Sequence, residues 1–143
     1  MGAIINKPSV ERITGYIDGA EKSGGRVVVA GRGAKPKNFV AGSESGYWVG
    51  PTLIDEVPPH TPLACEEIFG PVLSIVHVDS IEEAVEIENK NPYGNAASIF
   101  TSNGALAEYW AKKANAGMCG VNIGVPVPRE PFAFGGWNES KFG

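Results

Sequence analysis

The chain has 143 residues, with 12 Lys+Arg against 16 Asp+Glu and a formal net charge of −4. Its dispersed cations form no basic stripe, which argues against a nucleic-acid partner. No apolar run approaches the roughly 20 residues that cross a bilayer, and no signal peptide is visible. We therefore expect no membrane partner, and a cytoplasmic location, or the mitochondrial matrix if the source is eukaryotic.

The N-terminal half begins with a helix pattern over about 8–23, in which four apolar side chains share one face. These are Val10, Ile13, Ile17 and Ala20. Residues 26–30 predict a short strand, residues 31–46 a polar loop, and residues 47–54 an extended segment. The almost continuous apolar run of residues 72–78 predicts a strand that is buried on both faces.

The rest of the chain predicts helix, strand, helix and strand in turn, over about 81–89, 96–101, 103–116 and 118–123. Ser80 and Glu83 form a capping box at the start of the first helix. Leu106 and Trp110 belong to the buried stripe expected on the second. Strands that alternate with helices through short links are typical of parallel crossover units. We expect an α/β fold, with an open, mainly parallel sheet and helices on its faces.

The tail, residues 124–143, has no helical or strand period. Asn122 stands just before it, at the carboxyl end of a predicted strand, where α/β proteins bind ligands. Phe132, Phe134 and Trp137 are candidates to wall an apolar substrate tunnel. Ordinary packing in a core or an interface is the alternative for these three aromatic side chains.

The densest polar cluster lies at residues 65–71. Its two adjacent carboxylates, Glu66 and Glu67, are candidates for acid/base work or for gripping ligand hydroxyls. A solvated acidic loop is the alternative. Adjacent residues point in different directions, so the pair is not expected to share one proton.

Neither cysteine has the surroundings of an activated nucleophile. Cys65 shares a loop with His60, but that spacing does not indicate a Cys–His pair, and Cys119 is expected to be a small core residue in an apolar strand. The histidines and cysteines are too scattered for a metal site. Residues 31–33 lack the third glycine and the following helix of a phosphate-binding loop.

Five motifs occur in the order and spacing of the aldehyde dehydrogenase superfamily, which the chain resembles over essentially its whole length. They are residues 46–53, 66–72, 91–95, 121–122 and 134–140. Within that family, residues 121–137 are most similar to methylmalonate-semialdehyde dehydrogenases. This resemblance implies NAD as cofactor, coenzyme A as co-substrate and the conversion of a small branched semialdehyde to an acyl thioester.

The resemblance also implies roles for individual residues where the motifs match. Glu67 corresponds to the residue that hydrogen-bonds the nicotinamide ribose hydroxyls, and Phe69 to an aromatic residue that packs near the nicotinamide. Phe134 matches an aromatic wall of the substrate entrance, with Asn122 at its base. The loop over residues 125–131 is expected to shape acyl selectivity.

In that family the dinucleotide-binding domain and the catalytic machinery precede the segment that this chain resembles. Neither Cys65 nor Cys119 matches the nucleophile, so we expect no catalytic residue here. Residues 1–143 are expected to form one partial domain, the later part of a catalytic domain, inactive alone and with exposed apolar surface. The intact enzyme is expected to be a homo-oligomer acting on a small aldehyde. The alternative is a free-standing, non-catalytic α/β binding or interaction module.

Overall fold

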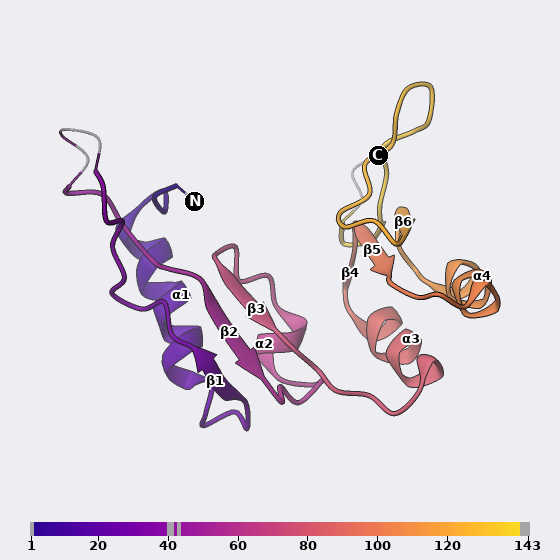
Figure 1. Ribbon diagram of the computed structural model, residues 1–143, viewed down its shortest axis with the longest axis horizontal. Coiled ribbons are helices and arrows are strands. Elements are labelled where there is room, and N and C mark those ends of the chain that lie inside the picture. Colours follow the sequence, from indigo (N-terminus) through magenta and orange to yellow (C-terminus); the bar gives the residue numbers. More distant parts are fainter. Residues whose placement is uncertain (1, 40–41, 43, 141–143) are drawn as a thin grey trace. The chain divides into compact units, whose positions relative to one another are not determined.

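The computed structural model describes residues 2–39, 42 and 44–140. The chain divides into two compact units, Met1–His77 (unit 1) and Val78–Gly143 (unit 2), whose elements are labelled in Figure 1. Residues 40, 41 and 43 of the expected 31–46 loop lie outside the described residues, and so do residues 141–143 of the 124–143 tail. The structure describes the rest of both segments. No helix in the described ranges is long and apolar enough to cross a membrane.

Unit 1 combines two helices with a mixed three-stranded sheet. Its elements are α1 (Lys7–Gly19), β1 (Arg26–Val29), β2 (Thr52–Asp55), α2 (Pro62–Cys65) and β3 (Val72–Ser74). The middle strand, β2, is antiparallel to β1 and parallel to β3. Helix α1 begins at Asn6, whose side chain accepts a hydrogen bond from the Ser9 N–H at 2.9 Å and so satisfies one of the free donors of the first turn.

The core of unit 1 forms where α1 packs against the sheet and the loops beside it (Figure 1). The predicted apolar stripe of α1 is confirmed, because Ile13 and Ala20 are fully buried and Ile17 nearly so. They pack with Ile54 of β2 and with Ile68, which follows α2. This packing places the segment between α2 and β3 directly against α1.

Unit 2 contains two helices and two small sheets. Its elements are α3 (Ile81–Lys90), β4 (Tyr93–Gly94), β5 (Ala96–Ile99), α4 (Gly104–Lys113), β6 (Met118–Val121) and β7 (Trp137–Asn138). Strands β5 and β6 are parallel, and β4 and β7 are antiparallel. The Ser80 half of the capping box is confirmed, since Ser80 Oγ accepts from the Glu83 N–H at 3.1 Å. Glu83 reaches back one residue further than expected, and its Oε2 accepts from the Asp79 N–H at 2.9 Å.

The α/β class predicted from the sequence is confirmed, with parallel pairing between β2 and β3 and between β5 and β6. That residues 1–143 form one partial domain stays a prediction. Two details were wrong. The strand over 72–78 was expected to be buried on both faces, but β3 ends at Ser74 and Leu73 is 61% exposed. Val72, on the opposite face, packs against the core, whereas no described residue of unit 1 covers the face on which Leu73 lies.

The buried stripe expected on α4 was also wrong in part. Trp110 is buried, whereas Leu106 is exposed. Helix α4 packs on α3, where the Trp110 indole N–H donates to Glu88 Oε2 at 3.0 Å. Leu106 lies one turn before Trp110, and no described residue covers it well enough to bury it.

Replacing Gly70 by alanine tests the packing of α1 on the following loop. A Cβ at Gly70 would lie 2.6 Å from Ile13 Cδ1 and 2.7 Å from its Cγ1, and a forced shift in a packed core costs about 1–3 kcal/mol. We expect Gly70→Ala to lower the free energy of unfolding, measured with urea, by that amount. Gly15→Ala is the control: its Cβ meets nothing within 4 Å, and it should stabilise α1 by about 0.5–1 kcal/mol. Equal stability of Gly70→Ala and the parent would contradict this packing.

Candidate functional site

The first candidate site is the 66–70 loop of unit 1, which connects α2 to β3. Ile68 is only 8% exposed and belongs to the core. Its two neighbours, Glu67 and Phe69, are exposed. Burial of the one apolar side chain between them therefore presents a carboxylate and an aromatic ring to the outside.

Helix α1 holds this loop from the other side. The Arg12 guanidinium donates to the main-chain carbonyl of Ile68 and, at 3.5 Å, to that of Glu67. The Tyr16 hydroxyl donates to Glu66 Oε2. Two side chains one helical turn apart on α1 thus contact three successive residues of the loop.

These contacts distinguish the two adjacent glutamates. The Glu66 carboxylate accepts a hydrogen bond from Tyr16. The Glu67 carboxylate has no hydrogen-bond or ion-pair partner among the described residues. Of the two, Glu67 is therefore the carboxylate without a partner in the part of the chain that the structure describes, and its role in binding the ribose stays a prediction. A carboxylate accepts hydrogen bonds at two oxygens, so it can bind two hydroxyl groups at once.

Phe69 has an unusual backbone conformation. Its φ is +50°, in the left-handed region that bulky residues rarely adopt, and its side chain is 78% exposed. Such conformations occur at ligand sites and cost about 1–3 kcal/mol each. Within unit 1, the 66–70 loop therefore exposes an apolar ring at Phe69 and, two residues earlier, the carboxylate of Glu67.

The second candidate site lies in unit 2, at the end of β6. Asn122 has a φ of +56°. Its side-chain oxygen accepts from the Thr101 N–H at 2.9 Å, and its side-chain NH₂ donates to the Thr101 carbonyl at 3.0 Å. Its own N–H donates to the Ile99 carbonyl at 2.8 Å. Asn122 thus ties the carboxyl ends of β5 and β6 together through both its main chain and its amide.

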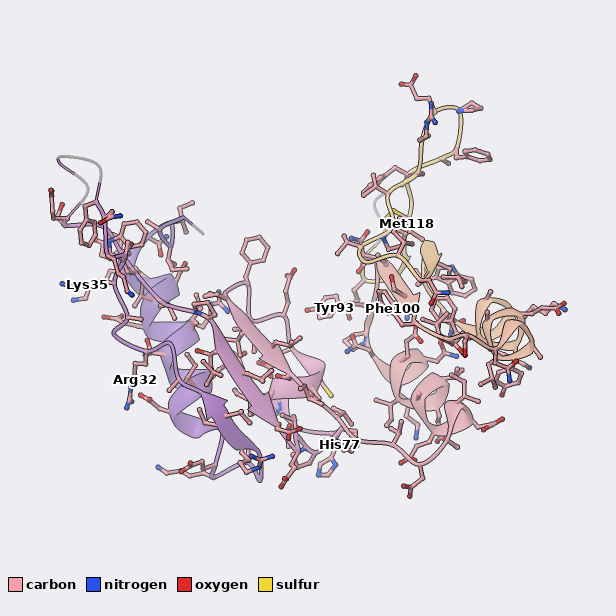
Figure 2. All side chains as sticks on the ribbon, viewed as in Figure 1. Arg32, Lys35, His77, Tyr93, Phe100 and Met118 are labelled. Atoms are coloured by element: carbon pink, nitrogen blue, oxygen red, sulfur yellow. The ribbon has the colours of Figure 1, made fainter. Side chains whose placement is uncertain are left out.

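The segment after Asn122 exposes apolar side chains, as the sequence predicts. Phe134 is 70% exposed, and the other large exposed apolar residues of this segment are Ile123, Val125, Val127, Phe132 and Trp137. The exposed ring of Phe100 follows β5 (Figure 2). The structure therefore leaves Phe134 open to solvent.

A cavity of about 550 Å³ in unit 2 includes neither Asn122 nor Phe134 in its lining. Tyr93, Ser98 and Val125 line it, together with Glu88. Glu88 Oε1 is buried without a hydrogen-bond partner among the described residues, while Oε2 accepts from the Trp110 indole. The two residues predicted to contact the substrate, Asn122 and Phe134, therefore do not line this cavity.

The cysteines differ from the sequence interpretation in one respect. Cys119 was expected to be a core residue, which is wrong: it is exposed. Alternate residues of β6 are buried, and Cys119 lies on the open face between Met118 and Gly120. Desolvation, with the nearby negative charge of Glu88, raises the pKa of the Cys119 thiol, so it is not an activated nucleophile.

The remaining candidates have structural explanations. The Cys65 thiol donates to the Pro59 carbonyl at 3.2 Å. In the Gly31–Gly33 segment, the Gly31 carbonyl accepts from the Gly50 N–H at 2.8 Å, and a Cβ at Gly31 would overlap the Gly50 carbonyl. Gly31 is therefore needed for a close approach of two main-chain segments. No three His, Cys, Asp or Glu side chains of the described ranges gather into a group that could hold a metal.

Sequence reasoning missed Arg12 and Tyr16. They are 50 or more residues from the loop that they contact, so no local motif includes them. One signal was available, since the two lie four residues apart, outside the apolar stripe of α1, and residues at that spacing share a helix face.

The chain is thus an α/β protein whose 66–70 loop exposes a carboxylate without a partner among the described residues and an aromatic ring. Residues 1–143 match the sequence model of the Aldehyde dehydrogenase family. Malonate-semialdehyde dehydrogenases from Pseudomonas aeruginosa and Bacillus subtilis (strain 168) are 43% and 40% identical over all 143 residues. This chain belongs to the aldehyde dehydrogenase family, and it spans 28% of the length of these curated relatives.

Solved structures agree. Methylmalonate-semialdehyde dehydrogenase from Oceanimonas doudoroffii has a TM-score of 0.91 and 42% identity, over 99% of this chain and 28% of that chain. An aldehyde dehydrogenase from Bacillus cereus in complex with NAD⁺ has a TM-score of 0.85 and 34% identity, over 100% of this chain and 27% of that chain. Both likenesses extend across the two candidate sites.

The reactivity of Cys119 tests its surroundings. In a Cys65→Ser variant, Cys119 is the one remaining thiol. Because its pKa is raised, less thiolate is present near pH ~8, and we expect iodoacetamide to alkylate it severalfold more slowly than a free cysteine. Glu88→Gln removes the negative charge and should speed the reaction, whereas Glu86→Gln, which changes a glutamate that pairs with Lys90, should not. Alkylation as fast as that of a free thiol would contradict this assignment.

Proposed function

We propose that this chain supplies the nicotinamide-facing loop and the aldehyde entrance of an NAD-dependent, CoA-acylating aldehyde dehydrogenase. The proposed substrate is a small semialdehyde, methylmalonate semialdehyde, which is converted to an acyl-CoA. The observation that supports this most directly is the free Glu67 carboxylate and the exposed Phe69 ring of one loop. The malonate- and methylmalonate-semialdehyde dehydrogenases among the relatives support the choice of substrate.

Glu67 and Phe69 fit the two parts of a nicotinamide riboside. The carboxylate of Glu67 accepts hydrogen bonds from the two ribose hydroxyls, and charge-assisted bonds of this kind are about twice as strong as neutral ones. The ring of Phe69 offers an apolar face to the nicotinamide. NAD, when bound, supplies the hydride acceptor of the oxidation.

The fixed shape of the 66–70 loop contributes to binding. Ile68 is anchored in the core, Phe69 has a φ of +50°, and Arg12 holds the main chain between them. A preformed site loses less conformational entropy on binding. The loop therefore favours one orientation of the nicotinamide half of the cofactor.

The aldehyde entrance is assigned to unit 2. Phe134 provides an apolar wall, and Asn122 stands at its base, where it ties the ends of β5 and β6. The apolar side chains of the 125–131 loop, among them Val125 and Val127, set the size and polarity of the acyl group that is accepted. A small branched chain suits such short aliphatic side chains.

The reacting groups are assigned to another part of the enzyme. Cys65 donates to a main-chain carbonyl and the pKa of Cys119 is raised, so neither supplies the thiolate that attacks the aldehyde. We therefore propose that residues 1–143 alone are inactive. The intact enzyme is proposed to be a cytoplasmic homo-oligomer.

The role of Glu67 can be tested by comparing it with its neighbour Glu66. The comparison uses a full-length aldehyde dehydrogenase in which this chain replaces the matching segment, called the hybrid enzyme below. Loss of one hydrogen bond to a charged group costs about 1.5–3 kcal/mol, so we expect Glu67→Gln to raise the KM for NAD by about tenfold or more. Glu66→Gln is the matched control and should change it little, because Glu66 is bonded to Tyr16. Formation of NADH is followed by absorbance.

Equal effects of the two substitutions would contradict the role of Glu67. A second experiment measures NAD reduction and NAD binding by the 143-residue chain alone. Reduction of NAD by this chain alone, with methylmalonate semialdehyde and coenzyme A, would show that it is not an inactive part of a larger enzyme. Tight binding of NAD without turnover would favour the non-catalytic binding module instead.

A further inference from the structure

We propose that Arg12 is a positioning residue for the proposed NAD site. It acts on the main chain of the 66–70 loop and so sets the directions in which the Glu67 carboxylate and the Phe69 ring leave the backbone. This inference rests on the proposed function of Glu67 and Phe69. It adds a residue of α1, more than 50 positions away in sequence, to the determinants of cofactor binding.

The contacts of Arg12 fix two successive peptide planes. Its guanidinium donates to the carbonyls of Glu67 and Ile68. Each carbonyl lies in a rigid plane with the N–H of the next residue. Holding the Ile68 carbonyl therefore fixes the plane that enters Phe69, whose φ of +50° is the unfavourable one in this loop. Holding the Glu67 carbonyl restricts the plane that leaves Glu67.

The Arg12 guanidinium binds main-chain carbonyls and does not pair with the Glu67 carboxylate. No described carboxylate lies within 4.0 Å of the Arg12 guanidinium, so the cation binds neutral carbonyls. Tyr16, one helical turn further along α1, takes the Glu66 carboxylate. The two α1 side chains thus secure the loop without occupying the Glu67 carboxylate, the group that a ligand needs.

The role is one of position, because other contacts keep the loop attached. Ile68 is buried in the core and Gly70 packs on Ile13, and neither contact involves Arg12. The Arg12 side chain is exposed, with a part-buried bond to the Ile68 carbonyl and an exposed one to the Glu67 carbonyl, so the core contacts of Ile68 and Gly70 do not depend on it. Its loss should leave the fold intact while the two peptide planes around Ile68 become free to rotate.

The hybrid enzyme tests this with three variants. We expect Arg12→Ala to raise the KM for NAD by about tenfold and to leave the KM for the aldehyde unchanged. Arg12→Lys should restore part of the affinity, because lysine donates without the planar fork of arginine. Arg32→Ala is the matched control, since it removes an exposed arginine that pairs with Asp18 of α1 and does not contact the loop (Figure 2).

A purely structural role would give a different pattern. A smaller folded fraction lowers the apparent kcat and leaves the KM for NAD as it was. Such a result for Arg12→Ala would overturn the inference. Residues that act through one another are not additive, so the double variant Arg12→Ala/Glu67→Gln should raise the KM for NAD by less than the product of the two single effects, because only the part of the Arg12 role that acts through Phe69 remains. Full additivity would also overturn it.

The two proposals fail separately. If Glu67→Gln raises the KM for NAD and Arg12→Ala does not, the proposed function stands and the positioning role is wrong. If neither raises it, the role of Glu67 itself is wrong. Should the Arg12→Ala hybrid not fold, backbone NMR order parameters in the 143-residue chain decide: those of residues 67–69 should be lower in Arg12→Ala than in Arg32→Ala, and equal values would overturn the inference.

Discussion

Burial of Ile68 against α1 is the contact on which the candidate cofactor site depends. Ile68 is buried while Glu67 and Phe69 on either side of it are exposed, and the left-handed φ of Phe69 turns the chain at this point. Ile13 of α1 fills the space beside Gly70, where a Cβ would not fit. The free carboxylate of Glu67 and the exposed ring of Phe69 are consequences of this packing.

Much of the fold could be predicted from the sequence, because its signals are local. The stripe of α1 that includes Ile13 and Ile17, and the capping box at Ser80, depend on residues within one or two helical turns. The edge position of β3 could not be predicted, because strand order depends on distant segments. An apolar run such as 72–78 indicates only that the side chains can be buried; it does not show what covers them.

The candidate site also has features that could be predicted from the sequence and features that could not. The motif resemblance led to Glu67 and Phe69, but the residues alone gave no means of choosing between Glu66 and Glu67. The hydrogen bond from Tyr16 to Glu66 supplies that choice. Arg12 and the contacts of Asn122 with Thr101 join residues far apart in sequence, so single-sequence patterns do not contain them.

The central claim is that Glu67 and Phe69 face the nicotinamide half of NAD. A crystal structure of the hybrid enzyme with bound NAD tests it most directly. The account predicts that the Glu67 carboxylate lies within hydrogen-bonding distance of the ribose hydroxyls and that the Phe69 ring contacts the nicotinamide. A structure in which Glu66 binds the ribose, or in which Glu67 faces away from the cofactor, would contradict it.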